Sequence, residues 1–202
     1  MIESADIRVE PGEKVGLIGP SGSGKTTIAM MIMKFVKPTS GRILVDGKDI
    51  TDVPERQYRK SRGVVQMIMQ NPYASMDPVQ SIKWSIEEAY GRFDSSEEYE
   101  ELLKSYSLPL NIINRRPNTL SGGELQRIAI MRALATDPKY LILDEATSML
   151  DVSLQASILN LILEKLEDQD KGMLMISHDR ALVNCVCDRV YFLEDGRCRE
   201  ME

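Results

Sequence analysis

The stretch Gly19-Pro20-Ser21-Gly22-Ser23-Gly24-Lys25-Thr26-Thr27 sets the fold class of this 202-residue chain. It fits the phosphate-binding pattern of a glycine, four residues and then Gly-Lys-Thr. An apolar run at 15–18 precedes it, and a helical pattern at 25–36 follows it. Glycines allow a tight turn, so successive backbone N–H groups can point into one concavity, and the helix adds its positive end. We therefore predict a strand, a phosphate-binding loop and a helix.

Two side chains carry the chemistry of this loop. We expect Lys25 to reach the β and γ phosphates of a nucleotide, and the Thr26 hydroxyl to ligate Mg²⁺. The alternative is a glycine-rich turn that binds nothing. That alternative is disfavoured because the lysine, the threonine and both flanking patterns are in register.

Composition restricts the class of partner. Hydrophobic residues make up 43% of the chain and charged residues 28%, which is typical of a globular domain. The net charge of -6 provides no global positive field for nucleic acid or anionic lipid, so phosphate binding must be local. No basic segment followed by an apolar one opens the chain, so we expect no secretory signal. Cys185, Cys187 and Cys198 are odd in number, which favours reduced thiols over a disulfide framework or a metal site.

Apolar runs alternate with helical patterns along the chain. Strands are expected on both sides of a Pro11-Gly12 turn within 5–18, and at 64–69, 140–143, 173–176 and 189–193. Helices are expected at 81–90, 95–106, 122–134, 152–166 and 179–186, and a hairpin at 41–50. The chain is therefore predicted to be α/β, with a helical insertion of some sixty residues.

Two acids follow the apolar run Leu141-Ile142-Leu143. In open α/β sheets, ligands gather beyond the carboxyl ends of the strands, where the phosphate loop also lies. We expect Asp144 to hold magnesium through water and Glu145 to polarise a water molecule that attacks the γ phosphate. The alternative is an acidic helix cap, since Thr147 and Ser148 come next.

A second anion site is predicted at Leu120-Ser121-Gly122-Gly123-Glu124-Leu125-Gln126-Arg127. A serine and two glycines begin a helix, which leaves unpaired N–H groups and a hydroxyl at its positive end. One nucleotide does not need two such sites in one chain. The second site is useful if it closes over a nucleotide that another chain holds.

This segment resembles the signature sequence of ATP-binding cassette proteins. The marks of that family occur in order along the chain. They are the phosphate loop, Gln70, the signature, Asp144-Glu145, Ser148-Met149-Leu150-Asp151, and His178 after an apolar strand. The resemblance implies a P-loop NTPase with a RecA-like core, a small antiparallel β-subdomain and an inserted α-helical subdomain. The core would take about 1–70 and 135–202, and the helical subdomain about 71–134.

The family resemblance also implies roles for single residues. Two subunits would form a head-to-tail dimer around two ATP molecules, with Ser121, Gly122 and Gly123 of one subunit on the γ phosphate held by the other. The implied catalytic residues are Glu145, His178 and Gln70; nucleotide contacts come from residues 19–27 and 121–123 and from Asp151; the magnesium contacts are Thr26, Gln70 and Asp144. Each has a simpler reading: Gln70 as a solvated loop residue, His178 as a structural partner, and Asp151 as a helix cap.

The segment that starts at Gln70 resembles a subgroup. Gln70-Asn71-Pro72-Tyr73-Ala74-Ser75-Met76-Asp77-Pro78 is similar to the ATPase subunits of oligopeptide, dipeptide and nickel importers. Val79 departs from the subgroup, which usually has arginine there. The resemblance implies an ATP-hydrolysing subunit of an importer of peptides, nickel or metal chelates. Such a subunit would be cytoplasmic, would lie on the inner face of the cell membrane and would dock on membrane permease subunits. The acidic net charge adds the expectation that the chain binds no nucleic acid.

The N-terminal region departs from the family pattern. No aromatic residue precedes Phe35, so the aromatic side chain that usually stacks on adenine is absent from this stretch, and the resemblance implies one missing strand of the β-subdomain. A soluble ATPase that assembles or activates an enzyme complex is the alternative function. A chromosome or DNA-repair ATPase is disfavoured, because the interval from Gln70 to Leu120 is short and the chain is acidic.

Overall fold

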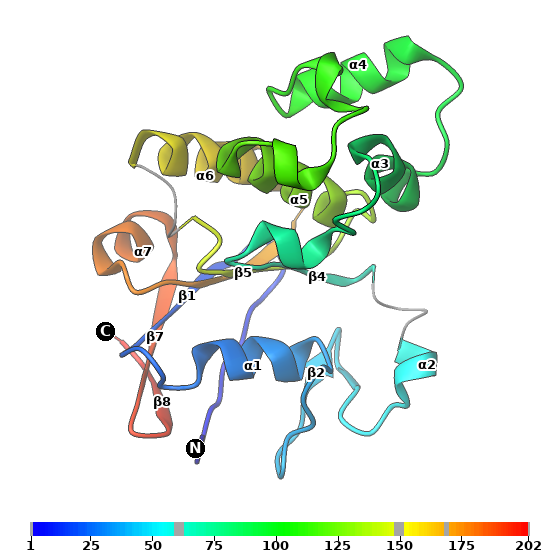
Figure 1. Ribbon diagram of the computed structural model, residues 1–202. Coiled ribbons are helices and arrows are strands. Elements are labelled where there is room, and N and C mark those ends of the chain that lie inside the picture. The colour runs from blue at the N-terminus through cyan, green and yellow to red at the C-terminus, as the bar shows by residue number, and fades with distance from the viewer. Residues whose placement is uncertain (1, 59–62, 148–151, 168–169, 202) are drawn as a thin grey trace. The chain divides into compact units, whose positions relative to one another are not determined.

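The computed structural model describes residues 2–58, 63–147, 152–167 and 170–201. Contacts divide the chain into two units. One consists of Met1–Met67, Lys139–Glu145 and Asp170–Glu202, and the other of Ile68–Pro138 and Ala146–Gln169. The first unit holds the sheet and the second is helical (Figure 1). The described residues of 146–169, which the family resemblance assigns to the core, fall in the same unit as the helical insertion.

A six-stranded sheet with the order β4-β5-β6-β1-β7-β8 is the framework of the first unit. Its strands are β1 (Lys14–Ile18), β4 (Val65–Ile68), β5 (Tyr140–Asp144), β6 (Gly172–Ile176), β7 (Arg189–Glu194) and β8 (Arg197–Glu200). β1 lies parallel to β6 on one side and to β7 on the other, and β5 pairs parallel with β6. The carboxyl ends of β1, β5 and β6 therefore meet at one edge of the sheet.

Continuous apolar sequence explains the central strands. β5 reads YLILD and β6 reads GMLMI, and both are almost wholly buried, as expected where both faces of a parallel sheet are covered. Helix α1 (Lys25–Ile32) contributes Ile28 and Ala29 to the core that these strands form, and Met33, just after the helix, adds to it. The predicted strand, loop and helix around the phosphate loop are confirmed.

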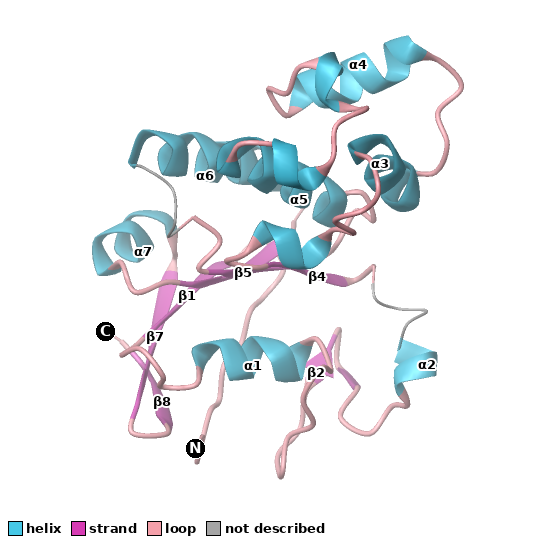
Figure 2. Cartoon of the chain, viewed as in Figure 1, coloured by secondary structure: helices cyan, strands magenta, loops and turns pink. Residues whose placement is uncertain are grey.

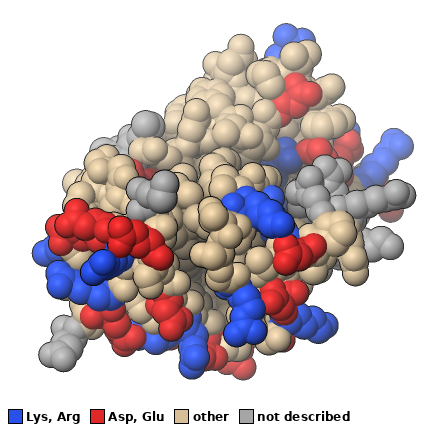
Figure 3. Space-filling view, turned by 90° about the horizontal axis from the view of Figure 1, so that it is seen from below, with Lys and Arg blue, Asp and Glu red and all other residues tan. Residues whose placement is uncertain are grey.

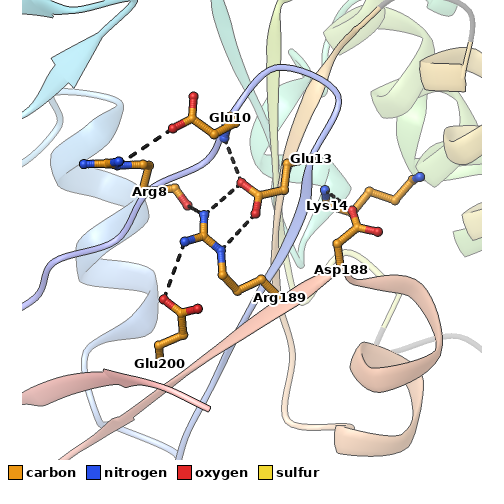
Figure 4. A network of polar contacts seen from close by, with 7 residues as sticks. All are labelled: Arg8, Glu10, Glu13, Lys14, Asp188, Arg189 and Glu200. Atoms are coloured by element: carbon orange, nitrogen blue, oxygen red, sulfur yellow. Dashed lines mark hydrogen bonds and ion pairs between the residues drawn. The ribbon is translucent and has the colours of Figure 1, made fainter. Parts of the chain in front are cut away.

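The strand predicted before Pro11 is wrong. Residues 5–10 form no strand, and the N-terminal segment meets β8 through an isolated bridge between Ser4 and Arg197 and an ion pair between Glu3 and Arg197. Its other support comes from Arg189, whose guanidinium donates to the carbonyl of Arg8 at 3.0 Å and to both carboxylate oxygens of Glu13 (Figure 4). The alternating pattern is present, but no neighbouring strand pairs with it.

The hairpin after α1 forms as predicted but is short. Strands β2 (Leu44–Val45) and β3 (Lys48–Asp49) pair antiparallel around Asp46 and Gly47, both with positive φ. Positive φ at both turn residues is the type I′ geometry that matches strand twist. Helix α1 was expected to reach residue 36 but stops at Ile32. Lys34 has φ 61°, and its ammonium donates to three carbonyls of residues 50–53.

Helices α3 (Ile82–Tyr90), α4 (Ser96–Ser105), α5 (Gly122–Leu134) and α6 (Val152–Glu167) make up the second unit (Figure 2). Ser81, Ser95 and Ser121 cap the first three through their hydroxyls, which explains why those helices begin where the sequence predicts. Short 3₁₀ turns at Pro72–Ser75, Leu110–Ile112 and Pro117–Thr119 connect them, and these were not predicted.

The remaining elements lie in the first unit. Helix α7 (Arg180–Val186) matches its prediction, whereas the four-residue α2 (Glu55–Tyr58) and strand β8 were missed.

Among the described helices, none combines the length and apolar character needed to cross a bilayer. On the face seen in Figure 3, acidic side chains lie between the basic ones. The described residues therefore form no continuous basic surface on that face.

Candidate nucleotide-binding site

Close packing requires glycine at two positions of the phosphate loop. A Cβ at Gly19 would lie 2.1 Å from the carbonyl oxygen of Leu193. Gly24, the residue before α1, has φ 108°, and a Cβ there would lie 2.9 Å from the side chain of Ile2. The loop is thus held against β7 and the N-terminal segment, and side chains at these positions would displace it.

Lys25 lies over its own loop. Its side chain is buried, and Nζ donates to the carbonyls of Gly19 and Pro20, both at 2.9 Å. Ser23 Oγ is also buried and has no hydrogen-bond partner among the described residues. A buried ammonium and an unsatisfied hydroxyl within one loop are the groups that an incoming phosphate would satisfy.

Thr26 and Asp144 meet at the edge of the sheet. Thr26 Oγ1 donates to Oδ1 of Asp144 at 3.1 Å. Burial raises the pKa of Asp144; the Thr26 hydrogen bond opposes this shift, and the neighbouring charge of Glu145 adds to it. A hydroxyl and a carboxylate fit Mg²⁺, which takes oxygen ligands, commonly one or two carboxylates with substrate phosphates and water.

Glu145 and His178 come from neighbouring strands. Glu145 follows β5 with φ 48°, a strained conformation for a residue with a side chain, and its N–H donates to the carbonyl of Ile176 at 3.0 Å. His178 follows β6, and its Nδ1 lies 3.6 Å from Oε1 of Glu145. The side chain of His178 is 66% exposed and that of Glu145 25%, so water can reach both. The structure therefore brings together two of the predicted catalytic residues.

The predicted second anion site begins α5. Ser121 caps the helix in a reciprocal box with Glu124, and Ser121 and Gly122 are exposed. Gly123 is buried: a Cβ there would lie 2.7 Å from Cδ2 of Leu154 in α6, so glycine allows these helices to approach. The serine and glycines thus stand at a helix N-terminus, as the sequence predicts.

Not all predicted site residues lie in the unit that holds the phosphate loop. Gln70 is exposed, just beyond β4, and belongs to the helical unit together with Ser121, Gly122 and Gly123. Asp151 lies outside the described residues. The approach of these residues to the phosphate loop stays a prediction.

Sequence reasoning missed two supporting residues. Ile2 packs on Gly24, and nothing in its immediate sequence signals that contact. Arg127 belongs to the signature segment, but the sequence assigned it no role. Its guanidinium donates to Ser157 Oγ of α6 at 2.9 Å and to the carbonyls of Tyr106 and Ser107. Arg127 therefore helps to fix the start of α5 within the second unit.

A phosphate loop after β1, with carboxylates at the end of parallel β5, defines a P-loop α/β nucleotide-binding domain. The family model described as ABC transporter matches residues 2–148, and the chain belongs to this family. This confirms the predicted membership and fold class.

Named relatives are similar over nearly the whole chain. A putative peptide import ATP-binding protein of Brucella ovis is 38% identical over 207 residues, covering 100% of this chain and 65% of the relative. The oligopeptide transport ATP-binding protein AppF of Bacillus subtilis is 37% identical, with 99% and 63% covered. The chain thus spans less than two thirds of the length of these curated relatives.

A solved structure resembles the fold closely. The ATP-binding cassette MJ0796, in a dimeric post-hydrolysis state bound to ADP and Pi, superposes with a TM-score of 0.83 at 28% identity. The match covers 100% of this chain and 90% of that one. Both the sheet and the helical insertion therefore have counterparts in an ABC cassette.

Proposed function

We propose that this chain binds and hydrolyses ATP with Mg²⁺ as the energy-coupling subunit of an ABC importer. Among peptides, nickel and metal chelates, the names of the relatives favour peptides as cargo. The observation that carries the proposal is the placing of Lys25, Thr26, Asp144, Glu145 and His178 around one edge of one sheet. The same names favour the importer over a soluble assembly factor.

Binding begins at the phosphate loop. Lys25 exchanges the carbonyls of Gly19 and Pro20 for the β and γ phosphates, and Ser23 Oγ gains a partner. Loop N–H groups and the start of α1 stabilise the negative charge. Thr26 and Asp144 would hold Mg²⁺, which would neutralise charge on the phosphates.

Glu145 and His178 act on the attacking water. The Glu145 carboxylate accepts a hydrogen bond from this water and takes its proton as the water oxygen bonds to the γ phosphorus. The bond from that phosphorus to the β–γ bridging oxygen breaks, which releases ADP and phosphate. His178, 3.6 Å from Glu145, donates to the γ phosphate and keeps the water beside the carboxylate. Gln70 would contact the metal and the water from the helical unit.

The site is completed by a second ABC subunit. Ser121, Gly122 and Gly123 of one subunit contact the γ phosphate held by the other, and Asp151 bridges the two. The dimeric state of the similar MJ0796 cassette supports this arrangement. ATP closes the dimer and hydrolysis opens it, so the subunit acts as a two-state switch on permease partners at the inner face of the cell membrane.

Co-purification tests the transport assignment. The chain is expressed with an affinity tag in its own cell, and detergent extracts are captured in the presence of ATP and orthovanadate. We expect membrane permease subunits in the eluate, identified by mass spectrometry, and their loss in a mock capture from untagged cells. Recovery of a soluble enzyme complex without any permease would contradict the importer assignment.

A further inference from the structure

Glu124 occupies the two hydrogen-bond donors that Ser121 contributes to the predicted second anion site. Its Oε2 accepts the backbone N–H of Ser121 at 2.8 Å and lies 2.8 Å from the Ser121 hydroxyl oxygen. The N–H of Glu124 in turn donates to Ser121 Oγ at 3.3 Å. The serine hydroxyl, which the proposed function assigns to a γ phosphate, is thus engaged within its own helix.

The competing group is an anion. Hydrogen bonds from the Ser121 backbone, then from the Ser121 hydroxyl, lower the pKa of Glu124, and the charge of Arg115 lowers it further. A γ phosphate is also an anion and would seek the same hydroxyl at the same helix N-terminus. Carboxylate and phosphate cannot share the single hydroxyl proton, and their like charges repel.

A second position for the carboxylate lies nearby. Glu124 Oε1 is 4.0 Å from Nη1 of Arg115, at the limit of an ion pair. The Arg115 side chain is 41% exposed, and its Nε donates to Thr119 Oγ1 at 3.3 Å. If the carboxylate leaves the Ser121 hydroxyl, it can close this pair and keep an opposite charge beside it.

We propose that Glu124 is a built-in competitor of the γ phosphate and sets the ATP-dependent affinity of one subunit for the other. In the free subunit the carboxylate holds the Ser121 hydroxyl. On dimer closure the γ phosphate of a nucleoside triphosphate takes that hydroxyl, and the carboxylate turns to Arg115. This inference rests on the proposed role of Ser121 in the dimer.

Neutralising Glu124 tests the inference. In a Glu145→Gln background, the dimer dissociation constant is measured by analytical ultracentrifugation at saturating Mg-ATP. Glu124→Gln keeps an oxygen that accepts the Ser121 N–H but removes the charge, so we expect about tenfold tighter association. Arg115→Gln removes the second position, so we expect weaker association. The ATP affinity of the dilute, monomeric subunit should change in neither variant.

A matched glutamate serves as the control. Glu98 stands three residues after Ser95, which caps α4 as Ser121 caps α5, and its N–H donates to the Ser95 hydroxyl. We expect Glu98→Gln to leave association unchanged. Equal tightening by Glu98→Gln would overturn the inference, because the effect would then be one of net charge.

The outcomes separate this inference from the proposed function. If the parent dimerises with ATP but Glu124→Gln associates no more tightly, the competitor role is wrong and the dimer stands. If the parent shows no ATP-driven dimer, the proposed function and this inference both fail. If Glu124→Gln does not fold, the Arg115→Gln result decides: unchanged or tighter association overturns the inference.

Discussion

Thr26 Oγ1 donates a hydrogen bond to Oδ1 of Asp144 at 3.1 Å, across 118 residues of sequence. The bond joins the first turn of α1 to the end of β5. Both oxygens are of the kind that Mg²⁺ binds, and the fold places them within hydrogen-bonding distance of each other. Preorganisation of this kind lowers the entropic cost of assembling a metal–nucleotide site.

Removal of the Thr26 hydroxyl should affect metal-dependent binding selectively. Thr26→Val keeps the shape of the side chain but loses the oxygen, so we expect about tenfold weaker binding of Mg-ATP. Binding of ATP in EDTA should be nearly unchanged, because the loop N–H groups and Lys25 remain. Titrations with a fluorescent ATP analogue, with and without Mg²⁺, measure both affinities. An equal loss in both conditions would show that Thr26 acts on the fold of the loop instead.

Replacement of His178 should lower turnover more than binding. His178→Ala removes the imidazole 3.6 Å from Glu145, and we expect kcat to fall about a hundredfold with KM changed less than threefold. Phosphate release under saturating Mg-ATP checks this prediction. Arg180→Ala, two residues on in α7, is the matched surface control. Parental kcat in His178→Ala would remove His178 from the catalytic mechanism.

The contact between α5 and α6 predicts that a second substitution restores the stability lost by a first one. Gly123→Ala would place its Cβ 2.7 Å from Leu154, and overpacking of this kind costs about 1–3 kcal/mol. Leu154→Ala removes the opposing atoms, so the double variant should recover much of the loss caused by Gly123→Ala. Urea unfolding of both single variants and the double variant gives the coupling energy. Additive losses would mean that the two side chains do not meet.

Arg189 should stabilise the N-terminal segment. Its guanidinium makes two bonds of 2.9 Å to Glu13, and the two side chains are only 24% and 19% exposed. Arg189→Ala should therefore lower the free energy of unfolding by about 2 kcal/mol. Arg197, paired with Glu3 but 78% exposed, is the control, and Arg197→Ala should cost less than about 1 kcal/mol. Equal losses would contradict the importance of burial.

Local sequence signals predicted most of the fold. Ser81, Ser95 and Ser121 announce their helices because a capping hydroxyl acts within four residues, and apolar runs locate β5 and β6 because both faces are buried. Elements that depend on distant partners were missed. Residues 5–10 alternate like a strand but have no strand beside them, whereas β8, with the polar sequence RCRE, lacks an apolar pattern and pairs with β7.

The same distinction holds for the candidate site: features that a local motif signals were predicted, and contacts that depend on distant residues were not. The motifs predicted that Lys25, Thr26 and Asp144 gather at one edge of the sheet, because in open α/β sheets ligands bind beyond the carboxyl ends of the strands. Spacing could not predict the 3.6 Å approach of His178 to Glu145, which depends on the positive φ of Glu145 and the register of β5 on β6. The sequence Ser-x-x-Glu is typical of a capping box such as the one between Ser121 and Glu124. The proposed competition between Glu124 and phosphate could be inferred only from the position of its carboxylate oxygen beside the Ser121 hydroxyl.

Light scattering of the Glu145→Gln variant tests the central claim most directly. This change keeps the shape of the side chain but removes its basicity, so ATP should bind and persist. With Mg-ATP the account predicts a stable dimer of twice the monomer mass and no detectable phosphate release, and with ADP only monomers. A variant that stays monomeric with ATP bound, or that hydrolyses ATP at the parental rate, would contradict it.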